Sequence, residues 1–246
     1  MDDRILLVPP EWAPDPGIYA RWPTVHATIE RLGTFLPVDH FRWPSLPGEP
    51  CDGDPQDCLI DAFRDQLRPV HHVICFVASE LILLALSRNP VRSLTTTAFI
   101  PSPATVVGDD VLATALTAQN VISRKLSQVV PLIMQGATAE EVERVIADLR
   151  RTSNYDFVVR LRDSFVSSPK APDGPIDIPA LYLSPAVQVN PGEEPIFAIF
   201  RSFVPGAQRG FLTEWGLRIQ EETGGHELAD KVIPFIEEVI AARDAG

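Results

Sequence analysis

Two short stretches of the chain contain residue types that could perform chemistry. The first is CFVASE, residues 75–80, which lies between two apolar segments. A serine at a sharp turn between a strand and a helix can act as a nucleophile, and Ser79 lies in this stretch. The second is GGH, residues 224–226, which precedes an amphipathic segment. The imidazole of His226 can act as a general base.

The overall composition is that of a globular protein with one large domain or two small ones. The chain has 246 residues, of which 45% are hydrophobic, and a formal net charge of −12. Phosphate binding needs clustered Lys and Arg, so we expect no nucleic-acid partner. The longest apolar runs are too short to span a bilayer, and the N-terminus does not resemble a signal peptide. We therefore expect no membrane association and a cytoplasmic location.

The three cysteines form an odd and sparse set. Cys51, Cys58 and Cys75 predict reduced thiols in a cytoplasmic protein. Neither Cys51 nor Cys58 has a further Cys or His at ligand spacing, so no zinc site is expected. The sequence also gives no indication of another metal or of a cofactor.

The first hundred residues alternate between short apolar runs and segments of helical spacing. This order implies a parallel sheet built by right-handed crossovers, which is an α/β fold with helices on the sheet. We expect Asp57 to cap one of the helices. The predicted strands are 5–8, 35–41, 73–77 and 91–100, and the predicted helices are 19–32, 58–67 and 81–87.

The strand signal is lost between about residues 101 and 175. Residues 111–134 have helical spacing, and Thr138 with Glu141 forms a capping box before a second helix. A third helix is expected from residue 153 or 154 to residue 165. We interpret residues 105–175 as a helical lid inserted into a core of 1–104 and 176–246; the alternative is a packing layer.

The last part of the chain returns to strand and helix patterns. We expect strands over 178–183 and 217–220 and a helix over 195–204. Residues 228–242 form an amphipathic terminal segment, in which Pro234 predicts a kink or a later start of the helix.

Four stretches, in this order, resemble the α/β-hydrolase fold, including the thioesterase branch that acts in polyketide assembly. The resemblance covers nearly the whole chain. It is more specific for the fold than for the chemistry. The stretches are ILLVPP, WPSLPGEP, VHHVICFVASELILLALSRNPVRSL, and IDIPALYLSP with EETGGHELADKVIPFIEEVI.

The resemblance does not extend to the family's catalytic serine. Aligning the helix after residue 80 with the family's elbow helix places Val77 at the nucleophile position. Cys75 and Ser79 then replace the flanking glycines, whose absence suggests a relaxed or differently shaped turn. A shift of two residues makes Ser79 the nucleophile, but Glu80 would then oppose the developing oxyanion. No carboxylate follows IPALYL, where the family places its acid.

Other residues of the candidate site follow from the same resemblance. His226 matches the family's histidine, although it could instead cap the last helix or lie on the surface. Glu80 is either an N-terminal helix charge or a carboxylate facing His226. The oxyanion loop would fall at Pro10, Glu11 and Trp12. The expected substrate-binding residues are Pro10, Glu11, Trp12, Phe76, Val77, Ala78 and Ser79.

Without a nucleophile, a covalent acyl-enzyme route is closed. The resemblance then implies a non-hydrolytic enzyme, a lyase, eliminase or cyclase, in which His226 removes a proton from a hydrophobic, polyketide-like small molecule. One alternative is an inactive pseudo-hydrolase that binds a ligand or partner. Another is an esterase or thioesterase with Ser79 in a displaced elbow. The sequence leaves a homodimer as one possible assembly.

Overall fold

The computed structural model describes most of the chain. Statements about structure below concern the described residues, which are 2–10, 15, 17, 22–44, 46, 51–102, 137–152, 155–185, 193–213 and 222–246. Glu11, Trp12, the helix expected over 111–134 and the strand expected over 217–220 lie outside them.

A parallel sheet forms the centre of the described structure. Its six strands follow the order β2-β1-β3-β5-β7-β8, and each neighbouring pair is parallel. This confirms the α/β fold class. The strands are β1 (Arg4–Val8), β2 (Val38–His40), β3 (His71–Cys75), β5 (Ser93–Thr96), β7 (Ala180–Pro185) and β8 (Gln208–Leu212).

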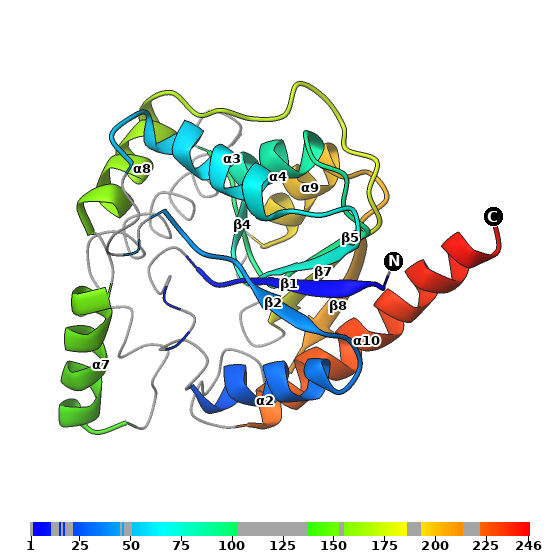
Figure 1. Cartoon of the computed structure of the whole chain (residues 1–246), viewed down its shortest axis with the longest axis horizontal. Coiled ribbons are helices and arrows are strands. Elements are labelled where there is room, and N and C mark those ends of the chain that lie inside the picture. The colour runs from blue at the N-terminus through cyan, green and yellow to red at the C-terminus, as the bar shows by residue number, and fades with distance from the viewer. Residues whose placement is uncertain are drawn as a thin grey trace.

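Helices cover both faces of this sheet (Figure 1). The helices α3, α4 and α9 lie on one face, and α2 and α10 lie on the other. The helices α7 and α8 belong to the segment between β6 and β7. The bounds are α2 (Pro23–Gly33), α3 (Pro55–Gln66), α4 (Glu80–Ser87), α7 (Ala139–Thr152), α8 (Tyr155–Ser167), α9 (Glu193–Phe203) and α10 (Thr223–Asp244).

The strands have apolar side chains on both faces, which is the pattern of a sheet covered on both sides. In β1, Leu6 and Val8 pack with the α3 and α4 side, whereas Ile5 and Leu7 pack with the α2 and α10 side. The four side chains are at most 2% exposed. Alternation along the strands therefore builds two separate cores.

Several predicted boundaries need correction. The cap of α3 is Asp54, whose carboxylate accepts from the Gln56 backbone N–H at 2.8 Å, so the prediction of Asp57 was wrong. Pro55 begins that helix, because its missing N–H costs nothing at the first helical position. The helix α10 runs continuously through Pro234. β8 lies at Gln208–Leu212, where no strand was predicted.

The expectation of three reduced cysteines was also wrong. Cys51 and Cys58 form a disulfide, with their Cα atoms 6.1 Å apart, and Cys75 is buried at the end of β3. A count of cysteines does not show that the start of α3 brings two of them together. The capping box of Thr138 and Glu141 at the start of α7 is confirmed.

None of the helices in the described ranges combines the length and the apolar character needed to cross a membrane.

A charge cluster around the buried Asp3 joins both chain ends at the amino ends of the strands. Asp3, 8% exposed, pairs with Arg243 of α10 at 2.8 Å and with Arg92 at 3.2 Å. His72 lies 3.9 Å from the same carboxylate, and its Nδ1 lies 2.8 Å from the Ser93 hydroxyl oxygen. Burial raises the pKa of Asp3, but the hydrogen bond and positive charge of Arg243 outweigh it and hold that pKa below its ordinary value.

The helices α2 and α10 approach closely at Gly225. A Cβ on Gly225 would collide with the carbonyl oxygen of Thr24 and would lie 3.0 Å from the Cβ of Ala27. The Thr28 hydroxyl, which donates to the Thr24 carbonyl oxygen at 2.8 Å, lies 3.4 Å from the Gly225 carbonyl oxygen. The glycine is therefore required by helix packing.

We predict that Gly225→Ala lowers the free energy of unfolding by about 2 kcal/mol, because the added methyl overpacks a backbone contact. Gly33→Ala in α2 is the matched control, since a Cβ there meets nothing within 4 Å. Urea denaturation followed by circular dichroism measures both. Equal stabilities of the two variants would contradict the packing role.

We also predict that stability falls between pH 7 and pH 4. Burial lowers the pKa of His72 to about 4, from an ordinary 6.5. Between these values only the unfolded chain takes up the proton, so the free energy of unfolding decreases as the pH falls, by about 3 kcal/mol in total. The Asp3 contribution is lost at lower pH, as the pH falls through its lowered pKa.

His72→Asn should remove most of this decrease, because Asn keeps a polar group near Ser93 and cannot gain a proton. His26→Asn is the control, since the His26 side chain is 65% exposed. Urea denaturation at pH 7, 5.5 and 4 tests the prediction, and a His72→Asn protein with an unchanged pH profile would refute it.

Candidate active site

The candidate site lies at the carboxyl ends of the parallel strands, where ligands bind in open α/β sheets. The segments after β1 and β3 meet there, because the Phe76 backbone N–H donates to the Val8 carbonyl oxygen at 3.3 Å. Pro10 is buried beside this edge. The segment after β5 joins them through the Thr97 hydroxyl, which donates to the Phe76 carbonyl oxygen at 2.8 Å.

The junction between β3 and α4 contains two further residues of strand. After a bend at Phe76 and Val77, β4 (Ala78–Ser79) pairs in parallel with β6 (Phe99–Ile100). The Ala78 backbone N–H donates to the Ala98 carbonyl oxygen at 2.9 Å. The strand expected over 91–100 is thus divided into β5 and β6. The chain enters α4 from extended backbone.

Ser79 is the N-cap of α4. Its φ of −142° and ψ of 168° are extended values that any residue adopts, and its hydroxyl accepts from the Ile82 backbone N–H at 3.4 Å. A nucleophile elbow instead holds its serine on a strained turn with the hydroxyl presented to the substrate. The Ser79 hydroxyl therefore has a structural role at the helix start.

The other residues of the junction are apolar, and only Val77 among them is partly exposed. Phe76 is 3% exposed, Ala78 is fully buried, and Val77 is partly exposed. The Cys75 thiol lies 3.0 Å from the Val77 carbonyl oxygen and is turned back toward the bend. Val77, at the aligned nucleophile position, provides a hydrocarbon wall and no reactive group.

Glu80 begins α4 with a fully buried carboxylate. One oxygen accepts from the backbone N–H of Ser102, itself fully buried, at 2.9 Å. The contact links the start of α4 to the chain that leaves β6. The N-terminal end of a helix also favours a negative charge electrostatically.

His226 lies in the first turn of α10 with an exposed side chain, and its backbone N–H donates to the Glu222 carbonyl oxygen at 3.1 Å. The glycines before it are buried, and Gly225 packs against α2. Among the described residues no hydrogen bond or ion pair joins His226 to Glu80. The structure thus groups Phe76 to Glu80 with Pro10, and it places His226 separately at the start of α10.

Two contributors to the site were missed in the sequence. Trp43, 2% exposed, donates its indole N–H to the Pro9 carbonyl oxygen at 2.8 Å and so fixes the chain after β1. The only feature of the sequence that could have pointed to Trp43 is its position as an aromatic residue in the proline-rich loop after the second predicted strand. Nothing in the sequence marked Ser102 as a partner of Glu80. Within the described ranges, no three His, Cys, Asp or Glu side chains gather to hold a metal ion.

The sequence matches no protein-family model and no curated protein. Solved structures resemble it over nearly the whole chain. A hydrolase from Oleispira antarctica is 13% identical with a TM-score of 0.65, covering 96% of this chain and 92% of that one. The epoxide hydrolase CorEH is 11% identical with a TM-score of 0.67 and the same coverage.

A third resemblance is to the RedJ thioesterase from the prodiginine biosynthetic pathway in Streptomyces coelicolor. It is 17% identical with a TM-score of 0.53, covering 95% of this chain and 90% of that one. These similarities, together with the parallel sheet flanked by helices, show that the chain has the α/β-hydrolase fold.

Proposed function

We propose that this chain is an enzyme that acts on an apolar small molecule without a serine nucleophile, with His226 as its general base. The reaction class is a proton abstraction that leads to elimination or ring closure, as in a lyase or cyclase. The substrate would lie at the carboxyl edge of the sheet, against Phe76, Val77 and Ala78.

The conformation of Ser79 is the observation that carries this proposal. A serine hydroxyl that caps a helix from extended backbone is not presented for attack on a carbonyl carbon. Val77 at the bend has no group that could replace it. Covalent catalysis is therefore disfavoured at this junction, and acid–base catalysis with orientation of the substrate remains.

The surroundings suit a reaction of an apolar substrate. Phe76 and Ala78 are buried hydrocarbon beside the partly exposed Val77, so an apolar substrate at this junction would meet hydrocarbon. His226 supplies an exposed imidazole at the start of α10, and within the described part of the chain no hydrogen bond occupies that side chain. The thioesterase resemblance, to RedJ and to a Vlm2 thioesterase domain with a bound dodecadepsipeptide, supports a natural product as the substrate class.

Ligand binding without catalysis is a second candidate function. Two observations favour it: the His226 side chain is exposed, and the Glu80 carboxylate is engaged by Ser102. A binding protein of this fold would keep the apolar surface at the junction and would not depend on His226.

We predict that His226→Ala lowers kcat/KM for ring opening of 5-nitrobenzisoxazole by at least about 100-fold, since this probe opens when a base removes a carbon-bound proton. Absorbance of the phenolate product measures the rate. Free imidazole should restore part of the rate of the His226→Ala protein.

His26→Ala is the matched control, because His26 is an exposed helical histidine on α2. It should keep the wild-type rate and gain nothing from imidazole. Equal rates for wild type, His226→Ala and His26→Ala would favour ligand binding and contradict the general-base proposal.

A second prediction concerns Ser79. Ser79→Ala should lower the free energy of unfolding by about 1 kcal/mol through loss of the cap, whereas Ser79→Thr, which can cap, should lower it less. Any hydrolysis of p-nitrophenyl acetate should be equal in wild type and Ser79→Ala. A large loss of hydrolysis in Ser79→Ala would support the esterase alternative instead.

A further inference from the structure

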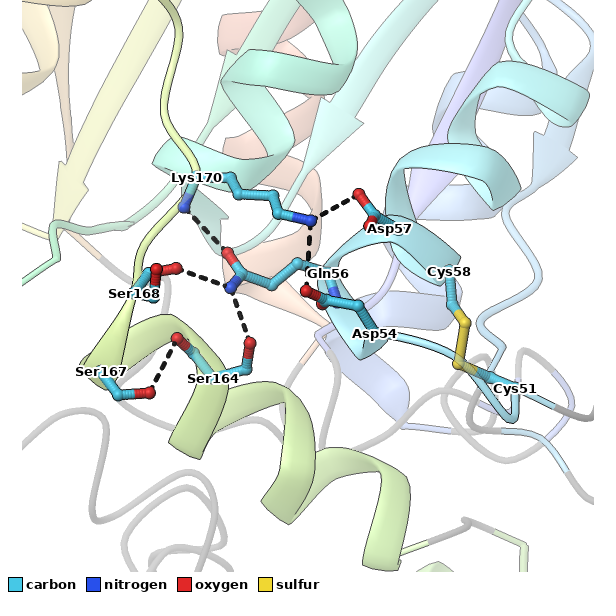
Figure 2. Close-up of polar contacts among 9 residues, drawn as sticks. All are labelled: Cys51, Asp54, Gln56, Asp57, Cys58, Ser164, Ser167, Ser168 and Lys170. Atoms are coloured by element: carbon cyan, nitrogen blue, oxygen red, sulfur yellow. Dashed lines mark hydrogen bonds and ion pairs between the residues drawn. A yellow bond between two sulfur atoms is a disulfide. The ribbon is translucent and has the colours of Figure 1, made fainter.

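The disulfide Cys51–Cys58 lies beside a group of polar contacts that attaches α8 to α3 (Figure 2). We call this group the α8 clasp. Its members are Cys51, Asp54, Gln56, Asp57, Arg160, Ser164, Ser168 and Lys170.

Gln56 is the centre of the clasp. Its side chain is 1% exposed and donates to the Ser164 hydroxyl at 2.7 Å and to the Ser168 carbonyl oxygen at 2.9 Å. Its own oxygen accepts from the Lys170 backbone N–H at 2.9 Å. All three partners lie in the last turns of α8 or just after it. This one side chain therefore provides hydrogen bonds to polar groups at the C-terminal end of that helix.

Charged groups extend the clasp on both sides. The Lys170 ammonium pairs with Asp54 at 3.2 Å and with Asp57 at 2.6 Å. Arg160 of α8 donates to the Cys51 carbonyl oxygen at 2.7 Å. The partners on the α3 side lie within residues 51–58, the loop that the disulfide closes.

Cys58 is accessible from solvent. It lines an open groove between α3 and the chain at residues 42–44. Cys51 is 9% exposed. Of the two cysteines, Cys58 is therefore the one that a small thiol in the groove can approach.

We propose that Cys51–Cys58 is a thiol–disulfide exchange site whose reduction loosens the attachment of α8. The thiolate of a low-molecular-weight dithiol attacks the Cys58 sulfur, and Cys51 leaves as a thiolate. The second thiol of the reagent then displaces Cys58, so the reagent is oxidised to its cyclic disulfide while both cysteines become thiols.

The coupling to α8 follows from chain entropy. The closed loop restricts residues 51–54, so the Cys51 carbonyl oxygen and the Asp54 carboxylate are held in place for Arg160 and Lys170. After reduction these groups gain conformational freedom. Forming each contact of the clasp then costs the entropy of ordering them. The inference does not depend on the proposed catalytic function.

Hydrogen exchange tests this proposal on the full chain. In wild type, dithiothreitol should accelerate amide exchange in peptides from residues 155–167 about tenfold, while peptides from α10 keep their rates. Native-state alkylation after reduction should label two more cysteines per chain than before. The Cys51→Ser/Cys58→Ser variant should exchange fast with and without reductant, and Gln56→Ala should do the same whether or not the disulfide is intact.

Four results would overturn the proposal. The first is alkylation of Cys51 and Cys58 in protein purified without reductant, which would mean that no disulfide forms. The second is resistance of the disulfide to dithiothreitol in the folded protein. The third is unchanged exchange of α8 after complete reduction, or slow exchange in the double variant. The fourth is equal acceleration of α8 and α10, which would indicate a general loss of stability.

Discussion

The parallel pairing of β4 with β6 is the constraint on which the conformation of the β3–α4 junction, and with it the proposed chemistry, depends. The pairing keeps Ala78 and Ser79 in extended backbone. In α/β-hydrolases with a nucleophile elbow, the same position holds a sharp turn from the strand into the helix. The helix α4 then begins with Ser79 as its cap and Glu80 buried against Ser102. The Ser79 hydroxyl, the nearest serine to the aligned nucleophile position, is thereby used as a helix cap.

The two ends of the sheet have different roles. At the amino ends, Asp3 joins both termini through ion pairs with Arg92 and Arg243. At the carboxyl ends, apolar residues after β1 and β3 form the surface on which the proposed chemistry depends. The α8 clasp lies apart from the amino-end cluster and fixes a helix of the segment that connects β6 to β7.

Much of the fold could be predicted because hydrophobic periodicity determines it. β1, β3 and α4 follow from apolar runs and helical spacing, and the capping box at Thr138 was found because its two residues are local. The division of residues 91–100 into β5 and β6 was not predictable, since it depends on pairing with β4. β8 was missed because QRGFL, the last strand in the order of the described sheet, carries little apolar alternation.

The site was harder to predict than the fold because its contacts join residues far apart in the chain. Glu80 and Ser102, and Trp43 and Pro9, meet through tertiary structure alone. The glycines before His226 illustrate a second limit: a motif typical of a catalytic loop also serves the packing of Gly225 against α2. Likewise, the cysteine count gave no sign that Cys51 and Cys58 are neighbours.

The most direct test of the central claim is the intact mass of the protein after incubation with a fluorophosphonate, a reagent that labels activated serines. If Ser79 serves only as the cap of α4, we expect no change in mass, whereas a serine hydrolase treated in parallel gains one adduct. A stoichiometric adduct that maps to Ser79 would contradict the account, because it would show that the junction presents an activated nucleophile.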